Sequence, residues 1–140
     1  MSHSSFVNNQ FVDSELTGRI IGCAMKVHAS LGNGFQEVIY QRSLEIELRD
    51  ESIEFSREHD MPIYYKGEHV GMRRVDFLVE GRISVELKAL IKLENVHLAQ
   101  AINYLEAYNI QTGLLINFGE KSLKFHRFTN SKYRQVSPKP

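Results

Sequence analysis

The amino-acid sequence predicts one α/β or α+β domain in which helices cover a β-sheet. Its 140 residues match the ~100–150 residues of a single domain. Apolar residues recur with the helical period in three segments and alternate with polar residues in several shorter ones. The composition, 42% apolar and 24% charged, lies near the globular average and excludes a disordered or fibrous chain.

Two helices are expected to open the domain, after a flexible polar arm over residues 1–12. Asp13 or Ser14 can cap the first helix. The Gly-Asn-Gly run at 32–34 ends it, because glycine and asparagine tolerate the positive φ of a helix C-cap. A second helix is expected over 36–49. The apolar face of the first helix comprises Leu16, Ile20, Ala24, Val27 and Leu31.

The period changes after residue 52, where alternating segments up to residue 88 predict an antiparallel meander. Turns are expected at 66–68 and 80–82. A helix over 95–108 follows, with Leu98, Ile102 and Leu105 on its apolar face. Apolar runs at 113–118 and about 123–127 predict two further strands. The single domain is thus expected to span 13–130, with a polar basic tail over 131–140.

Several features of the sequence restrict the class of protein. Cys23 is the only cysteine, so no internal disulfide or thiolate metal cluster is expected. No apolar run reaches the roughly 20 residues that a bilayer span needs. The first ten residues lack the apolar centre of a signal peptide, so we expect a cytoplasmic protein with no membrane partner.

The formal net charge is zero, but the charges are unevenly distributed. Residues 121–140 contain no Asp or Glu and carry six basic residues, so the first 120 residues are net acidic. Basic groups supply most of the affinity for a phosphate backbone. If nucleic acid binds, we expect it along this basic stretch and near Arg73 and Arg74. The six residues are Lys121, Lys124, Arg127, Lys132, Arg134 and Lys139.

Charged residues stand out on the strand predicted at 83–88. Alternation points Glu86 and Lys88 to the same face, while strongly apolar neighbours indicate an interior strand. A carboxylate and an ammonium group there must be paired, solvated in a cleft or bound to an ion. On this pattern alone, a surface pair on the wet face of an antiparallel sheet is the commoner arrangement.

A second carboxylate, Asp76, lies on the preceding strand. If the turn is centred near Gly81, Asp76 and Glu86 fall almost opposite each other. Opposed carboxylates repel, and a divalent cation compensates for this repulsion. Mg²⁺ prefers oxygen ligands and is commonly held by one or two carboxylates with waters and phosphate oxygens. Lys88 would then lie beside the metal, where it can hold a hydroxide or stabilise charge on phosphorus.

These residues carry a family resemblance. Asp76 followed by Glu86-Leu87-Lys88 resembles the Asp…Glu-x-Lys core of the PD-(D/E)XK nuclease superfamily, although Val75 replaces the Pro of its name. Residues 34–40 fit the Gly-x-x-Glu-x-x-Tyr signature of the GxxExxY family within it. Residues 97–105 resemble that family's Gln-bearing helix, and 114–119 its following strand. The resemblance extends over about 16–128.

This resemblance implies a restriction-endonuclease-like α/β fold, with a central mixed sheet of about four strands flanked by helices. It also implies a Mg²⁺ or Mn²⁺ ion held by Asp76, Glu86 and the carbonyl of Leu87. A metal-dependent enzyme that hydrolyses nucleic-acid phosphodiester bonds is therefore expected. DNA is expected in preference to RNA. A homodimer is a further possibility, because one metal site cuts one strand, as in a dimeric junction-resolving enzyme.

The same resemblance gives catalytic roles to Lys88, Glu37 and Gln100. Glu37 would approach the site from the start of the second helix and hold a metal-bound water, and Gln100 would reach in from the later helix. Each also has a plain structural interpretation. Glu37 would lie in the first turn of a helix, where the helix dipole favours an acidic residue. Gln100 is a polar residue of the kind found on exposed helix surfaces.

A second function remains open on the sequence alone. The domain can keep the nuclease fold and bind nucleic acid or a protein partner without cutting it. The opposed carboxylates of Asp76 and Glu86 argue against this alternative, because a protein that only binds does not need them.

Overall fold

The computed structural model describes residues 13–135, so the predicted arm over 1–12 and the end of the tail lie outside the described residues. The described chain forms three helices and five strands. The helices are α2 (Ser14–Leu31), α3 (Glu37–Asp50) and α4 (Asn95–Tyr108). The strands are β1 (Phe55–Tyr65), β2 (Glu68–Val79), β3 (Ile83–Lys88), β4 (Thr112–Asn117) and β5 (Lys124–Thr129). Predicted boundaries differ from these by one or two residues, as element ends commonly do.

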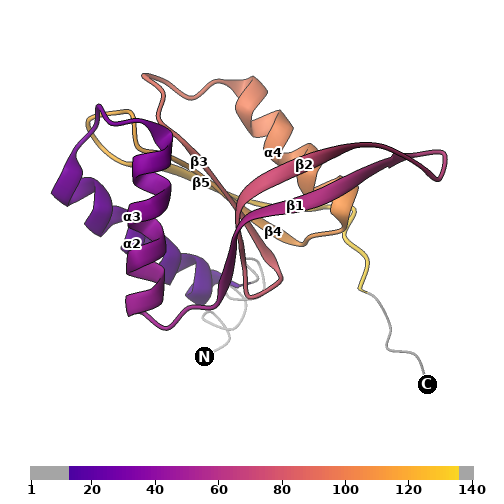
Figure 1. The fold of residues 1–140 in the computed structure, drawn as a ribbon, viewed down its shortest axis with the longest axis horizontal. Helices are drawn as coiled ribbons and strands as arrows, with labels where there is room; N and C mark the ends of the chain where they lie inside the picture. The colour runs from indigo at the N-terminus through magenta and orange to yellow at the C-terminus, as the bar shows by residue number, and fades with distance from the viewer. Residues whose placement is uncertain (1–12, 136–140) are drawn as a thin grey trace, which may run out of the picture.

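The strands form one mixed sheet in the order β1-β2-β3-β4-β5. β1, β2 and β3 make the predicted antiparallel meander, and β3 is an interior strand between β2 and β4. β3 and β4 run parallel because α4 crosses over between them, and β5 returns antiparallel to β4. The sheet has five strands rather than about four. β1 and β2 extend well beyond the other strands as a long hairpin (Figure 1).

Helices cover both faces of the sheet (Figure 1). α2 and α3 pack on one face, over a core that includes Phe77, Val85 and Leu114. The predicted apolar face of α2 packs into this core. α4 covers the other face, where Tyr104 and Leu105 pack with neighbouring strand residues. Burying each large apolar side chain contributes roughly 1.5–3 kcal/mol, so the two helical layers fix the sheet between them.

The buried face of α4 differs from the predicted one. The helix buries Ala101, Tyr104 and Leu105, whereas Ile102 is 37% exposed. Both sets of residues fit a helical period, so periodicity could not decide which one meets the sheet. The large Tyr104 ring has more apolar area to bury than Ile102, and its burial turns the helix.

None of the helices in residues 13–135 is long and apolar enough to cross a membrane.

Candidate functional site

Asp76 lies where the β2–β3 ladder ends. The last paired residues are Phe77 and Val85, and continuing that register by one residue places Asp76 opposite Glu86. One carboxylate oxygen of Asp76, Oδ2, accepts the backbone N–H of Leu87 at 2.7 Å. The Asp76 side chain thereby accepts a backbone N–H of β3. The β2 backbone no longer reaches this N–H, because the two strands diverge here. This bond fixes Asp76 against the segment that carries Glu86 and Lys88.

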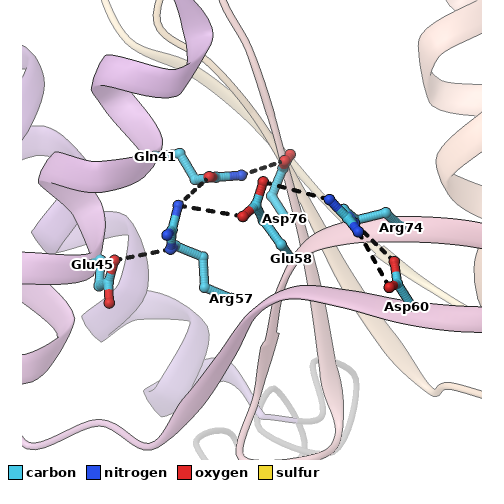
Figure 2. Close-up of polar contacts among 7 residues, drawn as sticks. All are labelled: Gln41, Glu45, Arg57, Glu58, Asp60, Arg74 and Asp76. Carbon is cyan, nitrogen blue, oxygen red and sulfur yellow. Dashed lines mark hydrogen bonds and ion pairs between the residues drawn. The ribbon is translucent and has the colours of Figure 1, made fainter.

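The second oxygen of Asp76 is held from α3. Gln41 Nε2 donates to Asp76 Oδ1 at 2.8 Å, and Gln41 Oε1 accepts from Arg57 Nη1 at 2.8 Å (Figure 2). Arg57 is anchored in turn by Glu45, at 3.0 Å between Nε and Oε1. A polar chain from α3 through β1 therefore orients Asp76. Sequence reasoning missed Gln41, for which the available signal was a polar residue amid the apolar positions of the second helix.

The start of α3 brings Glu37 to the same place. Glu37 is the first residue of the helix and Gln41 lies one turn later, so the two side chains share a helix face. Desolvation raises the pKa of Glu37, the Asp76 and Glu86 charges raise it further, and Lys88 lowers it. Glu37 therefore lies within electrostatic range of all three groups, while its side chain stays open to solvent.

Tyr40 fixes the position of this helix start. Its hydroxyl donates to the Gly32 carbonyl at 2.5 Å and accepts from the Phe35 N–H at 3.2 Å. Its buried ring stacks on Phe118 with centroids 4.6 Å apart. Gly34 adopts φ 115°, which a side chain would strain. In the 34–40 motif, Gly34 thus makes the turn, Tyr40 anchors it and Glu37 begins the helix that follows.

Asp76 and Glu86 lie opposite each other at the end of the β2–β3 ladder and form a pair of carboxylates, here called with Glu37 the carboxylate cluster. Burial raises the pKa of Asp76 despite the hydrogen bonds from Leu87 and Gln41, and the Glu86 charge raises it further. Each carboxylate keeps unused acceptor positions, since an ionised carboxylate offers about four. Within residues 13–135 no three His, Cys, Asp or Glu side chains form a metal-binding group. The two carboxylates offer oxygen atoms of the kind that Mg²⁺ prefers, so a cation there would need further ligands such as water or phosphate to complete its shell.

Glu86 forms an ion pair with Arg73, a contact that the sequence did not reveal. Arg73 Nη2 lies 2.6 Å from Glu86 Oε1, and the two side chains are 32% and 8% exposed. The Arg73 guanidinium also lies 5.2 Å from the centre of the Tyr104 ring. Sequence analysis placed Arg73 near a phosphate backbone but could not foresee this ion pair, which joins β2, β3 and α4.

The remaining predicted residues make no hydrogen bond or ion pair with Asp76 or Glu86 within residues 13–135. Gln100 is exposed on α4, and no hydrogen bond joins it to the carboxylates in the described part of the chain. The basic residues from Lys121 to Arg134 lie after β4, on β5 or after β5, whereas Asp76 lies on β2 and Glu86 on β3. Arg127 donates to Thr17 at 3.1 Å, and Lys132 pairs with Glu106 at 3.6 Å.

Comparison with known proteins identifies a family and similar solved structures. The family model of the PD-(D/E)XK nuclease superfamily matches residues 14–128. No curated protein matches the chain. Among solved structures, the crystal structure of SSO0001 aligns with a TM-score of 0.52 and 18% identity, over 66% of this chain and 48% of that one. This chain thus spans about half the length of SSO0001, and at such identity the likeness supports the fold alone.

The fold and the family match agree with each other. The five-stranded mixed sheet flanked by helices has the restriction-endonuclease-like architecture that the sequence predicts. The matched residues include every element from α2 into β5 and all of the carboxylate cluster. The chain therefore belongs to the PD-(D/E)XK nuclease superfamily.

Proposed function

We propose that this chain is a cytoplasmic nuclease of the GxxExxY family that hydrolyses DNA phosphodiester bonds with Mg²⁺ or Mn²⁺. The observation that carries the proposal is the register that sets Asp76 opposite Glu86, with Asp76 held by the Leu87 N–H and by Gln41. The anchoring of the helix start by Tyr40 supports the family assignment, because it gives the Gly-x-x-Glu-x-x-Tyr signature a structural purpose.

Asp76, Glu86 and the Leu87 carbonyl would hold the cation. When bound, the metal supplies Lewis-acid stabilisation of the negative charge that develops on the phosphoryl oxygens. Asp76 is held for this task at both oxygens, by Leu87 and Gln41. Such positioning matters because a ligand that must reorient during the reaction loses the benefit of a preorganised site.

Lys88 and Glu37 supply the remaining chemistry. Water attacks phosphorus while the bond to the leaving ester oxygen breaks. One proton leaves the attacking water, and a solvent water supplies the proton that the leaving oxygen takes up. The Lys88 ammonium stabilises the charge on the pentacoordinate phosphorus and orients the water. Glu37 accepts the proton, and its raised pKa makes it a better acceptor than an ordinary carboxylate.

The second candidate function is a binding module that keeps the fold without cutting. The observation that favours it is the ion pair between Arg73 and Glu86, since a carboxylate neutralised by arginine needs no metal. Metal titration separates the two functions. A nuclease binds Mn²⁺ and loses it when Asp76 is replaced by Ala, whereas the binding module binds DNA equally well with and without that substitution.

A cleavage assay tests the proposal. The full chain is incubated with single-stranded, duplex and branched DNA and with RNA, in Mg²⁺, Mn²⁺ or EDTA. We expect cleavage of DNA in either metal, none in EDTA, and loss of cleavage in Glu86→Ala and Lys88→Ala. Intact substrates under every condition would overturn the proposal, as would cleavage that both variants retain.

The assembly is a further part of the proposal. One carboxylate cluster cuts one strand, so a homodimer would supply the two sites that a double-strand or junction cut requires. The solution mass, measured by light scattering with and without duplex DNA, tests this. A mass near twice 16.2 kDa is expected, and a monomer under both conditions would contradict the dimer.

A further inference from the structure

The ion pair between Arg73 and Glu86 lies where the proposed cation would bind. Arg73 Nη2 and Glu86 Oε1 are 2.6 Å apart, a short charge-assisted hydrogen bond. The Glu86 side chain is 8% exposed, so an ionised carboxylate there needs a partner. In the chain without a cation, Arg73 is that partner.

We propose that Arg73 is a displaceable counter-ion, which neutralises Glu86 until a divalent cation binds and then transfers its guanidinium to a phosphate of the nucleic acid. This inference rests on the proposed function, because it takes Glu86 as a metal ligand. It makes Arg73 a substrate-binding residue whose availability depends on the metal.

Charge explains why Arg73 must move. A divalent cation at Glu86 would bring two positive groups to one carboxylate, and like charges that close repel strongly in a partly desolvated site. The guanidinium has room to move, because the Arg73 side chain is 32% exposed while Glu86 is buried. The cation also neutralises Asp76, which one guanidinium paired with Glu86 does not.

Tyr104 keeps the released guanidinium in the site. The Arg73 guanidinium lies 5.2 Å from the ring centre, within the range of a cation–π interaction. The Tyr104 ring is buried and cannot follow Arg73 into solvent. Its hydroxyl is buried without a hydrogen-bond partner in the part of the chain that the structure describes, so it can donate to an incoming anion. A planar guanidinium at this ring suits the oxygens of a phosphate.

Arg74, the next residue, provides a matched control. It pairs with Asp60, at 2.8 Å from Nε to Oδ1, and lies 3.8 Å from Glu58, both on the hairpin (Figure 2). Its side chain is more exposed than that of Arg73 and has no contact with Glu86. Arg73→Gln and Arg74→Gln therefore remove the same charge from adjacent positions, and only the first removes the counter-ion.

The first test is a Mn²⁺ titration without nucleic acid, by calorimetry, of the wild type, Arg73→Gln, Arg74→Gln and Glu86→Ala. We expect the Mn²⁺ dissociation constant to fall roughly tenfold in Arg73→Gln, which corresponds to ~1.4 kcal/mol, and to change little in Arg74→Gln. Glu86→Ala should bind Mn²⁺ more weakly than the wild type. Binding by Arg73→Gln but not by the wild type would support the proposal too.

Two results would overturn the inference in different ways. Affinity in Arg73→Gln equal to or below that of the wild type, with Mn²⁺ binding still lost in Glu86→Ala, refutes the counter-ion and leaves the nuclease proposal intact. No Mn²⁺ binding by the wild type or by Arg73→Gln refutes the metal site itself. Because Arg73→Gln leaves Glu86 unpaired, its melting temperature is also measured, and Mn²⁺ should raise it more than in the wild type.

The second test measures the transfer to phosphate. Anisotropy gives the affinity for a labelled DNA duplex in EDTA and in Ca²⁺, with gels to verify that the duplex stays intact. Reciprocal coupling predicts that Ca²⁺ tightens DNA binding in the wild type and in Arg74→Gln but not in Arg73→Gln. An equal gain in Arg73→Gln, or no gain in the wild type, would overturn the transfer step. Arg73→Lys should keep only part of the gain, because an ammonium cannot form the planar pair.

Discussion

The carboxylate of Asp76 accepts the backbone N–H of Leu87 at 2.7 Å, across the point where β2 parts from β3. A side chain therefore completes the ladder between the strands that carry the two opposed acids. The hydrogen bond couples the shape of the sheet to the geometry of the site. Disturbing Asp76 or the residues that hold it should thus affect stability and metal binding together.

Gln41 tests that coupling. Gln41→Leu removes the donor to Asp76 and the acceptor of Arg57. The loss leaves buried polar groups unsatisfied, so the free energy of unfolding in urea should fall by about 1–3 kcal/mol. Mn²⁺ affinity should fall as well, because Asp76 is no longer fixed. Gln100→Leu on the exposed face of α4 is the control, and an equal loss in both variants would refute the role of Gln41.

Tyr40 tests the anchoring of α3. Tyr40→Phe keeps the stacking on Phe118 but removes the bonds to Gly32 and Phe35. Unfolding in urea should become easier by about 1–2 kcal/mol, and the cleavage rate should fall because Glu37 loses its fixed position. Tyr65→Phe at the exposed hairpin should change neither. Full activity in Tyr40→Phe would show that the anchor does not serve the site.

Glu37 should make the metal-free protein less stable as the pH rises. Desolvation and the Asp76 charge raise its pKa in the folded state, so the folded chain holds this proton more tightly than the unfolded chain. Its contribution is therefore favourable below the ordinary pKa of glutamate and is lost as the pH rises through the raised pKa. Glu37→Gln should be more stable than the wild type at neutral pH, with a difference that vanishes on acidification.

The measurement is the urea midpoint in EDTA at a series of pH values from about 2.5 to 7, which spans the ordinary pKa values of Asp and Glu. Asp60 gives a control of opposite sign, because the hydrogen bond from Arg74 lowers the pKa of its carboxyl. Asp60→Asn should be less stable than the wild type at neutral pH, and its deficit should shrink as the pH falls. A Glu37→Gln curve parallel to the wild type would contradict the proposed placement of Glu37.

The basic C-terminal stretch should contribute salt-sensitive affinity for DNA. The structure argues against deleting everything after Phe128, because Asn130 Nδ2 donates to the Leu105 carbonyl at 3.0 Å and anchors α4. Replacing Lys121 and Lys124 by Gln leaves that contact intact. Each lost phosphate contact should reduce the slope of log affinity against log salt by roughly 1. An unchanged slope would place the DNA elsewhere.

Sequence patterns predicted most of the fold, because each helix and strand depends on the local spacing of apolar and polar residues. The strict alternation around Glu86 and the turn at Gly81 set the register that brings Asp76 opposite it. The face of α4 was predicted correctly at Leu105 and wrongly at Ile102, since Ala101 and Ile102 fit a helical period equally well and only the sheet decides between them. A local pattern cannot report which of two possible faces meets another layer.

The spacing of residues in the sequence could not predict which residues support the site. Gln41 contacts Asp76, and Arg57 contacts Gln41, between segments far apart in the sequence. Arg73 on β2 reaches Glu86 on the neighbouring strand β3. These contacts depend on how the hairpin twists against α3 and α4. The sequence predicts the acids, whose types and positions carry the chemistry, but not the neutral and basic partners that hold them.

Lys88 gives the most direct test of the central claim, that this cluster hydrolyses phosphodiester bonds. Single-turnover cleavage of a labelled DNA substrate in Mn²⁺ is measured for the wild type and Lys88→Met, with Mn²⁺ affinity measured on the same preparations. We predict that Lys88→Met still binds Mn²⁺ and cleaves at least ~100-fold more slowly than the wild type. Equal cleavage by the two proteins, or none by the wild type, would contradict the claim.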